Sequence, residues 1–161
     1  MAEIIVLRIV HILGGIFWVG SGLFTTFFLG PALATAGPAA GQVMQGLQAR
    51  RLFTVLPIVA ILTMLSGLRL MWITSGGFDH AYFETTRGMT FSSAGGLAII
   101  AFFVSLLMVR PAAARMGAIA GTGASQDEMA RLRRRISVGS VIAVVLLILA
   151  ATGMAAARYL A

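Results

Sequence analysis

Residues 4–29 read IIVLRIVHILGGIFWVGSGLFTTFFL, an apolar run that carries only one arginine and one histidine. A helix needs about 20 mostly apolar residues to cross a bilayer, so this run is long enough for one span. Glu3 stands where a cleaved signal peptide would have basic residues, and the run is too long for the apolar part of such a peptide. We therefore expect a retained first membrane helix.

Three further segments, residues 53–75, 91–110 and 136–158, have the length and composition of membrane spans. Apolar residues make up 59% of the chain, charged residues only 11%, and the mean hydropathy is +0.97. A soluble domain has about 25% charged residues, so this composition indicates a membrane protein. The absence of cysteine excludes disulfides, thiolate metal sites and thiol catalysis. We predict one domain, residues 1–161, with an all-α four-helix bundle in the lipid bilayer.

Local signals suggest where these helices begin and end. Gly30 and Pro31 are typical of a helix stop, which would end the first span at residue 29. A half-polar helix is then expected from Pro38, running into the second span. Ser125 and Glu128 have the spacing of a capping box, and predict a helix that continues through the arginines into the fourth span.

Most arginines fall in two of the predicted loops. By the positive-inside rule these loops are cytoplasmic, whereas both chain termini and residues 75–90 lie outside. The net charge of +7 is explained by topology, so we expect no nucleic-acid partner. The sequence predicts a multi-pass protein of the bacterial inner membrane. The arginines of the two cytoplasmic loops are Arg50, Arg51, Arg110, Arg115, Arg131, Arg133, Arg134 and Arg135.

The two halves of the chain resemble each other. In each half a glycine pair, at Gly14 or at Gly95, precedes a proline by about sixteen residues, and an arginine-bearing loop leads into the next span. Such a pattern predicts two tandem two-helix repeats related by an axis along the membrane normal. The alternative is a chance match between apolar segments. The position that corresponds to His11 is Ser92, so the polar groups belong to the first half.

The first span carries a polar stripe, because residues three, four, seven and eleven apart share one helix face. Its small residues leave room beside the histidine, which lies roughly 10 Å inside the span at 1.5 Å per residue. Arg69 lies at a similar depth on the second span, and the outer loop adds His80. An ionisable residue in a span is a functional-site hypothesis by default. The members of the stripe are Arg8, His11, Gly15, Trp18 and Gly22.

Simpler interpretations of these residues remain open. Arg8 and Arg69 are near enough to the interface for their guanidinium groups to reach water. His11 can be explained by a hydrogen bond to a neighbouring helix, and His80 as an ordinary loop residue. Trp18 also suits the aromatic belt at a membrane interface.

The pattern LRIVHILGGIFWVGSGLF, residues 7–24, followed by a proline at the far end of the span, resembles the copper-resistance protein D (CopD)-like membrane family. It is similar, more distantly, to the HemJ-type protoporphyrinogen oxidases. The resemblance implies a helical membrane protein in which the histidine of the first span binds haem or copper. His11 matches that histidine by position, and Trp18 matches the aromatic residue. The chain departs from the pattern in having no counterpart of the HemJ intramembrane lysine.

The first functional hypothesis is a membrane protein that binds haem b and has an electron-transfer or oxidoreductase role. His11 would be an axial ligand, with Arg8 or Arg69 neutralising propionates in the outer leaflet. The second ligand would be His80, or His11 of a second copy in a homodimer. A quinone or a porphyrin is the expected substrate.

Two other functions stay open. The chain is compatible, as an alternative, with an accessory or structural subunit of a larger membrane complex. Copper binding or transport is the other alternative, through the imidazoles of His11 and His80 and the thioethers of Met64 and Met71. A methionine pair seven residues apart is also typical of a helix core.

Overall fold

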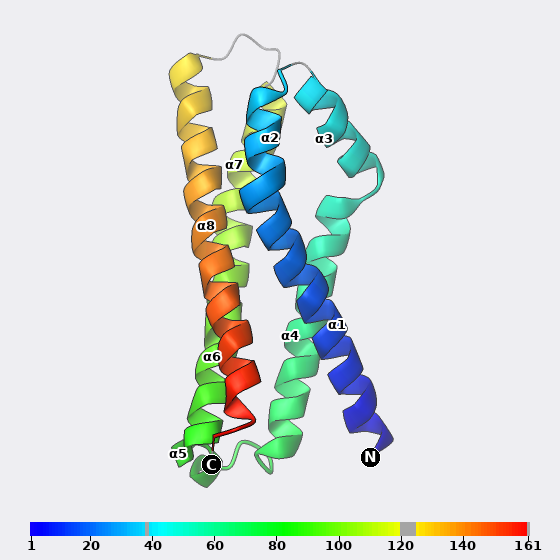
Figure 1. Ribbon diagram of the computed structural model, residues 1–161, viewed down its shortest axis with the longest axis vertical. Coiled ribbons are helices and arrows are strands. Elements are labelled where there is room, and N and C mark those ends of the chain that lie inside the picture. Colours follow the sequence, from blue (N-terminus) through cyan, green and yellow to red (C-terminus); the bar gives the residue numbers. More distant parts are fainter. Residues whose placement is uncertain (38, 120–124, 161) are drawn as a thin grey trace.

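The computed structural model describes residues 1–37, 39–119 and 125–160. Every regular element in these ranges is a helix, and four helices are long and apolar enough to cross a membrane (Figure 1). These four helices confirm the predicted all-α fold, and the chain has the architecture of a multi-pass membrane protein. They are Ala2–Thr35, Leu52–Thr74, Thr86–Ile119 and Gln126–Ala157.

The first long helix passes through the predicted stop at Gly30 and Pro31. Pro31 lacks an N–H, and the preceding turn widens so that the N–H of Gly30 donates to the carbonyl of Thr25. The Thr25 hydroxyl donates to the Ser21 carbonyl over 2.7 Å. The predicted end at residue 29 is wrong, because the π turn accommodates the proline and the helix continues beyond it. The parts of this helix are α1 (Ala2–Phe24), the π-helical η1 (Thr25–Leu29) and α2 (Gly30–Thr35).

The third long helix repeats this local structure. The N–H of Arg110 donates to the carbonyl of Ser105, and Pro111 follows directly. The Ser105 hydroxyl donates to the Ala101 carbonyl over 2.9 Å. This helix therefore also extends beyond the predicted end at residue 110. Its parts are α6 (Thr86–Val104), η2 (Ser105–Val109) and α7 (Arg110–Ile119).

The second span is a separate helix from the half-polar one before it. Arg51 between them has a left-handed backbone, with φ of 58°, and its carbonyl accepts the N–H groups of Thr54 and Val55. The prediction of one continuous helix is wrong at this point, whereas the span itself matches residues 53–75 closely. Pro38, the expected first residue of the half-polar helix, lies outside the described residues. The two helices are α3 (Ala39–Ala49) and α4 (Leu52–Thr74).

Side-chain caps begin the last two long helices. The Ser125 hydroxyl accepts the N–H of Glu128 over 3.2 Å, which confirms the predicted cap of α8 (Gln126–Ala157). Thr85 caps α6 in the same way, accepting the N–H of Gly88 over 3.0 Å. The short α5 (His80–Glu84) lies between α4 and α6. The arginine-rich segment and the fourth span are thus one helix, as predicted.

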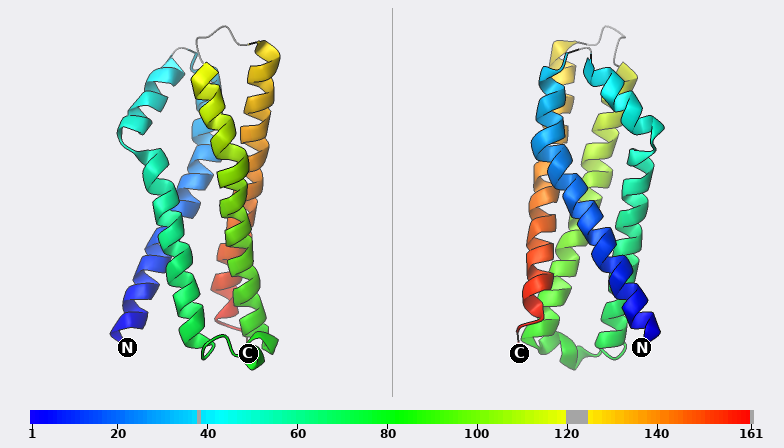
Figure 2. Two further views of the ribbon diagram at one scale, coloured as in Figure 1. Left: turned by 180° about the vertical axis from the view of Figure 1, so that it is seen from behind. Right: turned by 45° about the vertical axis from the view of Figure 1, so that its right-hand side comes forward.

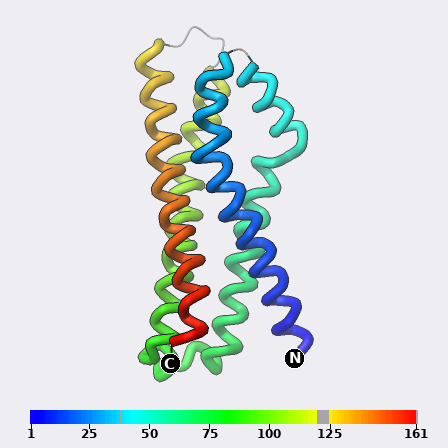
Figure 3. Tube along the Cα trace, in the orientation of Figure 1, coloured from blue at the N-terminus to red at the C-terminus, as the bar shows by residue number. Residues whose placement is uncertain are grey.

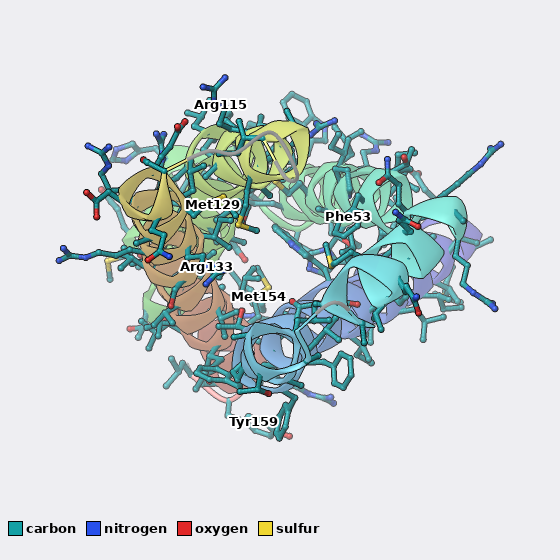
Figure 4. All side chains as sticks on the ribbon, turned by 90° about the horizontal axis from the view of Figure 1, so that it is seen from above. Phe53, Arg115, Met129, Arg133, Met154 and Tyr159 are labelled. Carbon is teal, nitrogen blue, oxygen red and sulfur yellow. The ribbon has the colours of Figure 1, made fainter. Side chains whose placement is uncertain are left out.

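The four long helices form two packed pairs. α1 packs mainly on α4 and α6 mainly on α8, whereas the pairs meet more sparingly through α1–α8 and α4–α6 (Figure 2). Seen from above, the helices stand in a ring, with Met129 and Met154 on its inner side and Arg115 and Tyr159 pointing outward (Figure 4). A small cluster of buried side chains joins the pairs. It consists of Trp18, Ala60, Ala101, Ala143 and Leu147.

The two chain termini lie at the same end of the bundle, together with α5 (Figure 3). The opposite end carries α3, the end of α7 and the beginning of α8 (Figure 1). At 1.5 Å per residue, the 34 residues of Ala2–Thr35 extend over about 51 Å, compared with a hydrocarbon core of about 30 Å. The long helices are therefore long enough to project beyond the apolar layer.

Candidate functional site

His11 on α1 is partly buried and faces α4. Its Nδ1 lies 2.7 Å from the backbone carbonyl oxygen of Thr63. A carbonyl oxygen only accepts hydrogen bonds, so the proton of a neutral imidazole must be on Nδ1. The lone pair is then on Nε2. This contact fixes both the tautomer and the orientation of the His11 ring.

The surface of α4 that receives the imidazole has no side chain at its closest point. A Cβ atom on Gly67 would lie 2.6 Å from Cε1 of His11 and 3.0 Å from its Nδ1. The Thr63 carbonyl also accepts the hydroxyl of Ser66 over 2.9 Å. The His11 ring therefore lies on a glycine notch beside a carbonyl that two side chains share.

The glycine pair of the first span brings α1 close to α4. A Cβ on Gly14 would clash with the Thr63 side chain, and a Cβ on Gly15 would touch the Thr63 methyl group at 3.9 Å. The small residues were expected to leave room for a ligand beside His11. On this face of α1 that room is occupied by α4, so Gly14 and Gly15 serve helix packing.

Trp18 lies in the middle of the bundle rather than at a membrane interface. Its side chain is only 9% exposed, and its ring meets that of Phe102 edge to face at 6.3 Å. Along this stripe the packing partner of α1 changes from α4 at His11 to α8 at Gly22, about three turns later. A Cβ on Gly22 would lie 3.3 Å from Val144 of α8. The prediction of an interfacial belt position for Trp18 is wrong.

The two arginines predicted for the site differ in their contacts. Arg69 of α4 donates from both Nε and Nη2 to one carboxylate oxygen of Glu3, at 2.8 Å each. This pair ties the beginning of α1 to α4, with about half of each side chain exposed. Arg8 is exposed and forms no ion pair with the residues that the structure describes. Of the two, Arg8 is the cation free to meet an anionic group.

His80 does not lie near His11 in the fold. It begins α5, which packs against α6, and its side chain is 89% exposed. Its Nδ1 lies 3.2 Å from a carboxylate oxygen of Glu84. In the described ranges, no three His, Cys, Asp or Glu side chains are grouped so that they could hold a metal ion.

The two methionines considered for copper have separate surroundings. Met64 packs against the buried cluster around Trp18. Met71 reaches toward α6, where a Cβ on Gly95 would lie 3.8 Å from its terminal methyl group. The favoured explanation of both methionines is therefore helix packing.

The residues that complete the His11 contact were not among the predicted site residues. Thr63, Ser66 and Gly67 are spaced three and four apart, so they share one face of α4. Thr63 and Ser66 are polar, yet they are two of the three buried residues of α4. Their spacing was the available signal, but only the structure shows that this face meets His11.

Comparisons with known proteins add no relative: the chain matches no protein-family model, no curated protein and no solved structure. The resemblance to the CopD-like family therefore rests on the residues of the first span alone and stays a prediction. The contacts of His11 are therefore the observations that bear on this function.

Proposed function

We propose that the chain is a membrane b-type haem protein with His11 as an axial ligand. The observation that carries the proposal is the 2.7 Å contact between Nδ1 of His11 and the Thr63 carbonyl. Metal-ligating histidines almost always donate their other ring N–H to a carbonyl, a carboxylate or water, which orients the ring and raises its basicity. The same contact leaves the Nε2 lone pair of His11 for iron.

The remaining candidate residues indicate which groups of this chain could hold the propionates and the second axial position of a haem. Arg8 has a free guanidinium near the chain terminus and suits a propionate, whereas Arg69 would first have to leave Glu3. His80 is a poor second ligand, since it is exposed and bound to Glu84 on a different helix pair. We propose His11 of a second copy instead, across a homodimer. A bound haem b would supply a one-electron redox couple for electron transfer or for oxidising a quinone or porphyrin.

We further propose that the His11 end of the bundle faces outward from a bacterial inner membrane, with both termini on that side. The arginines gathered at the other end, in α7, at the beginning of α8 and between α3 and α4, support this orientation. The tandem repeat is likewise proposed. Its support is the position of the two π turns, which begin 80 residues apart at Thr25 and Ser105. In both halves one residue separates the end of the π turn from a proline.

The absorption spectrum of the purified protein tests the haem proposal. We expect a Soret band that His11→Gly removes and His80→Ala leaves in place. Added imidazole should restore the band in His11→Gly, because free imidazole can replace a ligand but not a bond between helices. A wild-type protein without a Soret band would overturn the proposal, as would a band that His11→Gly leaves unchanged.

A structural role, as an accessory subunit of a larger membrane complex, is the second candidate. The observation in its favour is that the His11 ring is already accommodated between α1 and α4, over Gly67. Mild solubilisation followed by mass spectrometry distinguishes the two. Stoichiometric partner subunits would support the structural role, and a coloured homo-oligomer would count against it.

A further inference from the structure

A groove lies between α8 and η2, at the end of the bundle opposite His11, with a volume of about 280 Å³. Its lining combines three arginines with two apolar side chains. A neighbouring hollow of about 410 Å³ shares Arg131 and Arg134 and adds Asp127. The lining residues of the groove are Met108, Arg131, Arg134, Arg135 and Val138.

The three arginines line the groove because of their spacing, and they do so mainly with the aliphatic parts of their side chains. Residues 131, 134, 135 and 138 are three, four and seven positions apart, so they share one face of α8. Nη2 of Arg135 donates to the carbonyl oxygen of Leu107 over 3.3 Å. In a regular α-helix that carbonyl would accept the N–H of residue 111, but Pro111 has none. Arg135 is thus held in place across the π turn.

The other two arginines have no counter-charge among the described residues. Arg131 and Arg134 form no ion pair there, and Glu128 is engaged by Arg115 at 3.1 Å. Asp127 is the one carboxylate among the residues that line the neighbouring hollow. In the neighbouring hollow, the two guanidinium groups of Arg131 and Arg134 face the single carboxylate of Asp127. The hollow therefore has a net positive charge, which suits an anion.

The groove also lies at the right depth for a lipid headgroup. The apolar part of α8 begins at residue 136, so the three arginines lie within about 8 Å of it along the helix axis. Met108 and Val138 continue the groove toward the apolar layer. The charged hollow beside the largely apolar groove matches a phosphodiester with acyl chains below it.

We propose that this hollow binds the headgroup of an anionic phospholipid, and that the adjoining groove receives the beginning of an acyl chain. The positive-inside rule explains how many arginines gather at this end, but not why Arg131 and Arg134 line both a charged hollow and an apolar groove. Basic pockets between membrane helices on the cytoplasmic side are suited to such headgroups. The proposal is independent of the haem site, which lies at the other end of the bundle.

Native mass spectrometry of the detergent-solubilised full chain tests it, with phosphatidylglycerol, phosphatidylcholine or inorganic phosphate added. We expect phosphatidylglycerol to bind in preference to phosphatidylcholine, and phosphate not to displace it. Each arginine near an anionic lipid surface contributes roughly fivefold in affinity, so Arg131→Gln/Arg134→Gln should weaken binding roughly 25-fold. Arg133→Gln is the matched control, because residue 133 points to the opposite side of α8.

Three results would overturn the proposal. One is equal binding of both lipids, and another is displacement of phosphatidylglycerol by phosphate, which would indicate a simple anion site. The third is an equal loss in Arg133→Gln, which would indicate unspecific charge attraction. Circular dichroism verifies that the variants fold. Should the double variant not fold, Arg134→Gln alone should show the smaller loss of about fivefold.

Discussion

Gly67 of α4 and His11 of α1 fit each other only because position 67 has no side chain. A Cβ there would lie 2.6 Å from Cε1 of His11, a distance that real Cβ atoms essentially never show. The ring is held on this notch by the bond from Nδ1 to the Thr63 carbonyl. The same contact therefore allows α1 to pack closely on α4 and fixes the orientation of the histidine.

Gly67→Ala should consequently destabilise the protein, although alanine is the better helix former. We expect a loss of about 1–3 kcal/mol in the free energy of unfolding, because the added methyl group overpacks the contact. Denaturant unfolding in detergent, followed by circular dichroism, measures it. Gly20→Ala is the control, since a Cβ at position 20 meets nothing within 4 Å. It should be neutral or stabilising by up to about 1 kcal/mol, and equal losses in both variants would contradict the prediction.

Trp18→Ala should be among the most damaging single substitutions. Its ring lies in the cluster that joins the two helix pairs, and removing a buried tryptophan costs about 3–5 kcal/mol. The same unfolding experiment applies, with Trp72→Ala for comparison. Trp72 is 47% exposed, so its truncation should cost clearly less. A larger loss at Trp72 would contradict the central position of Trp18.

Arg135→Gln and Pro111→Ala should be coupled. Arg135 donates to the Leu107 carbonyl, which Pro111 deprives of its helical partner. Arg135→Gln should therefore cost about 1 kcal/mol in the wild-type background. In the Pro111→Ala background the cost should fall toward zero, because the new N–H can donate to the same carbonyl. A double-mutant cycle of unfolding free energies measures the coupling, and strictly additive effects would refute it.

The orientation can be tested cleanly because the chain contains no cysteine. Single-cysteine variants Thr86→Cys, at the beginning of α6, and Gln45→Cys, in α3, lie at opposite ends of the bundle. In intact spheroplasts a membrane-impermeant thiol reagent should label Thr86→Cys and not Gln45→Cys. Both should be labelled after permeabilisation. The reverse pattern would place the His11 end in the cytoplasm.

The four spans were predictable because apolar length alone identifies a membrane helix. Their full extents were not. Gly30 with Pro31 is typical of a helix stop, and the sequence contains no sign that a π turn carries the helix past it. Arg110 with Pro111 behaves in the same way. The break before α4 could not be predicted either. Arg51 has a left-handed backbone with φ of 58°, a conformation that arginine does not favour.

Part of the candidate site was predictable from the cost of placing a histidine in an apolar helix. A hydrogen bond from His11 to a neighbouring helix was one of the alternatives, and the structure supplies its acceptor, Thr63. Gly67 could not be chosen from among the glycines of the chain, because its role depends on how α4 is rotated against α1. Trp18 was misplaced for the same reason: an interfacial and a central tryptophan look alike in sequence.

The division into two helix pairs has a consequence for how the protein is made. Contacts within a pair join neighbouring spans of the chain, and those between the pairs are fewer. The α1–α4 pair contains both His11 and its acceptor, so it can assemble while the second half is still on the ribosome. The turn with positive φ at Gly76 and Gly77 then separates two hairpins that enter the bilayer one after the other. In that order of assembly, the contact of Trp18 with Phe102 would form only when the second hairpin packs against the first.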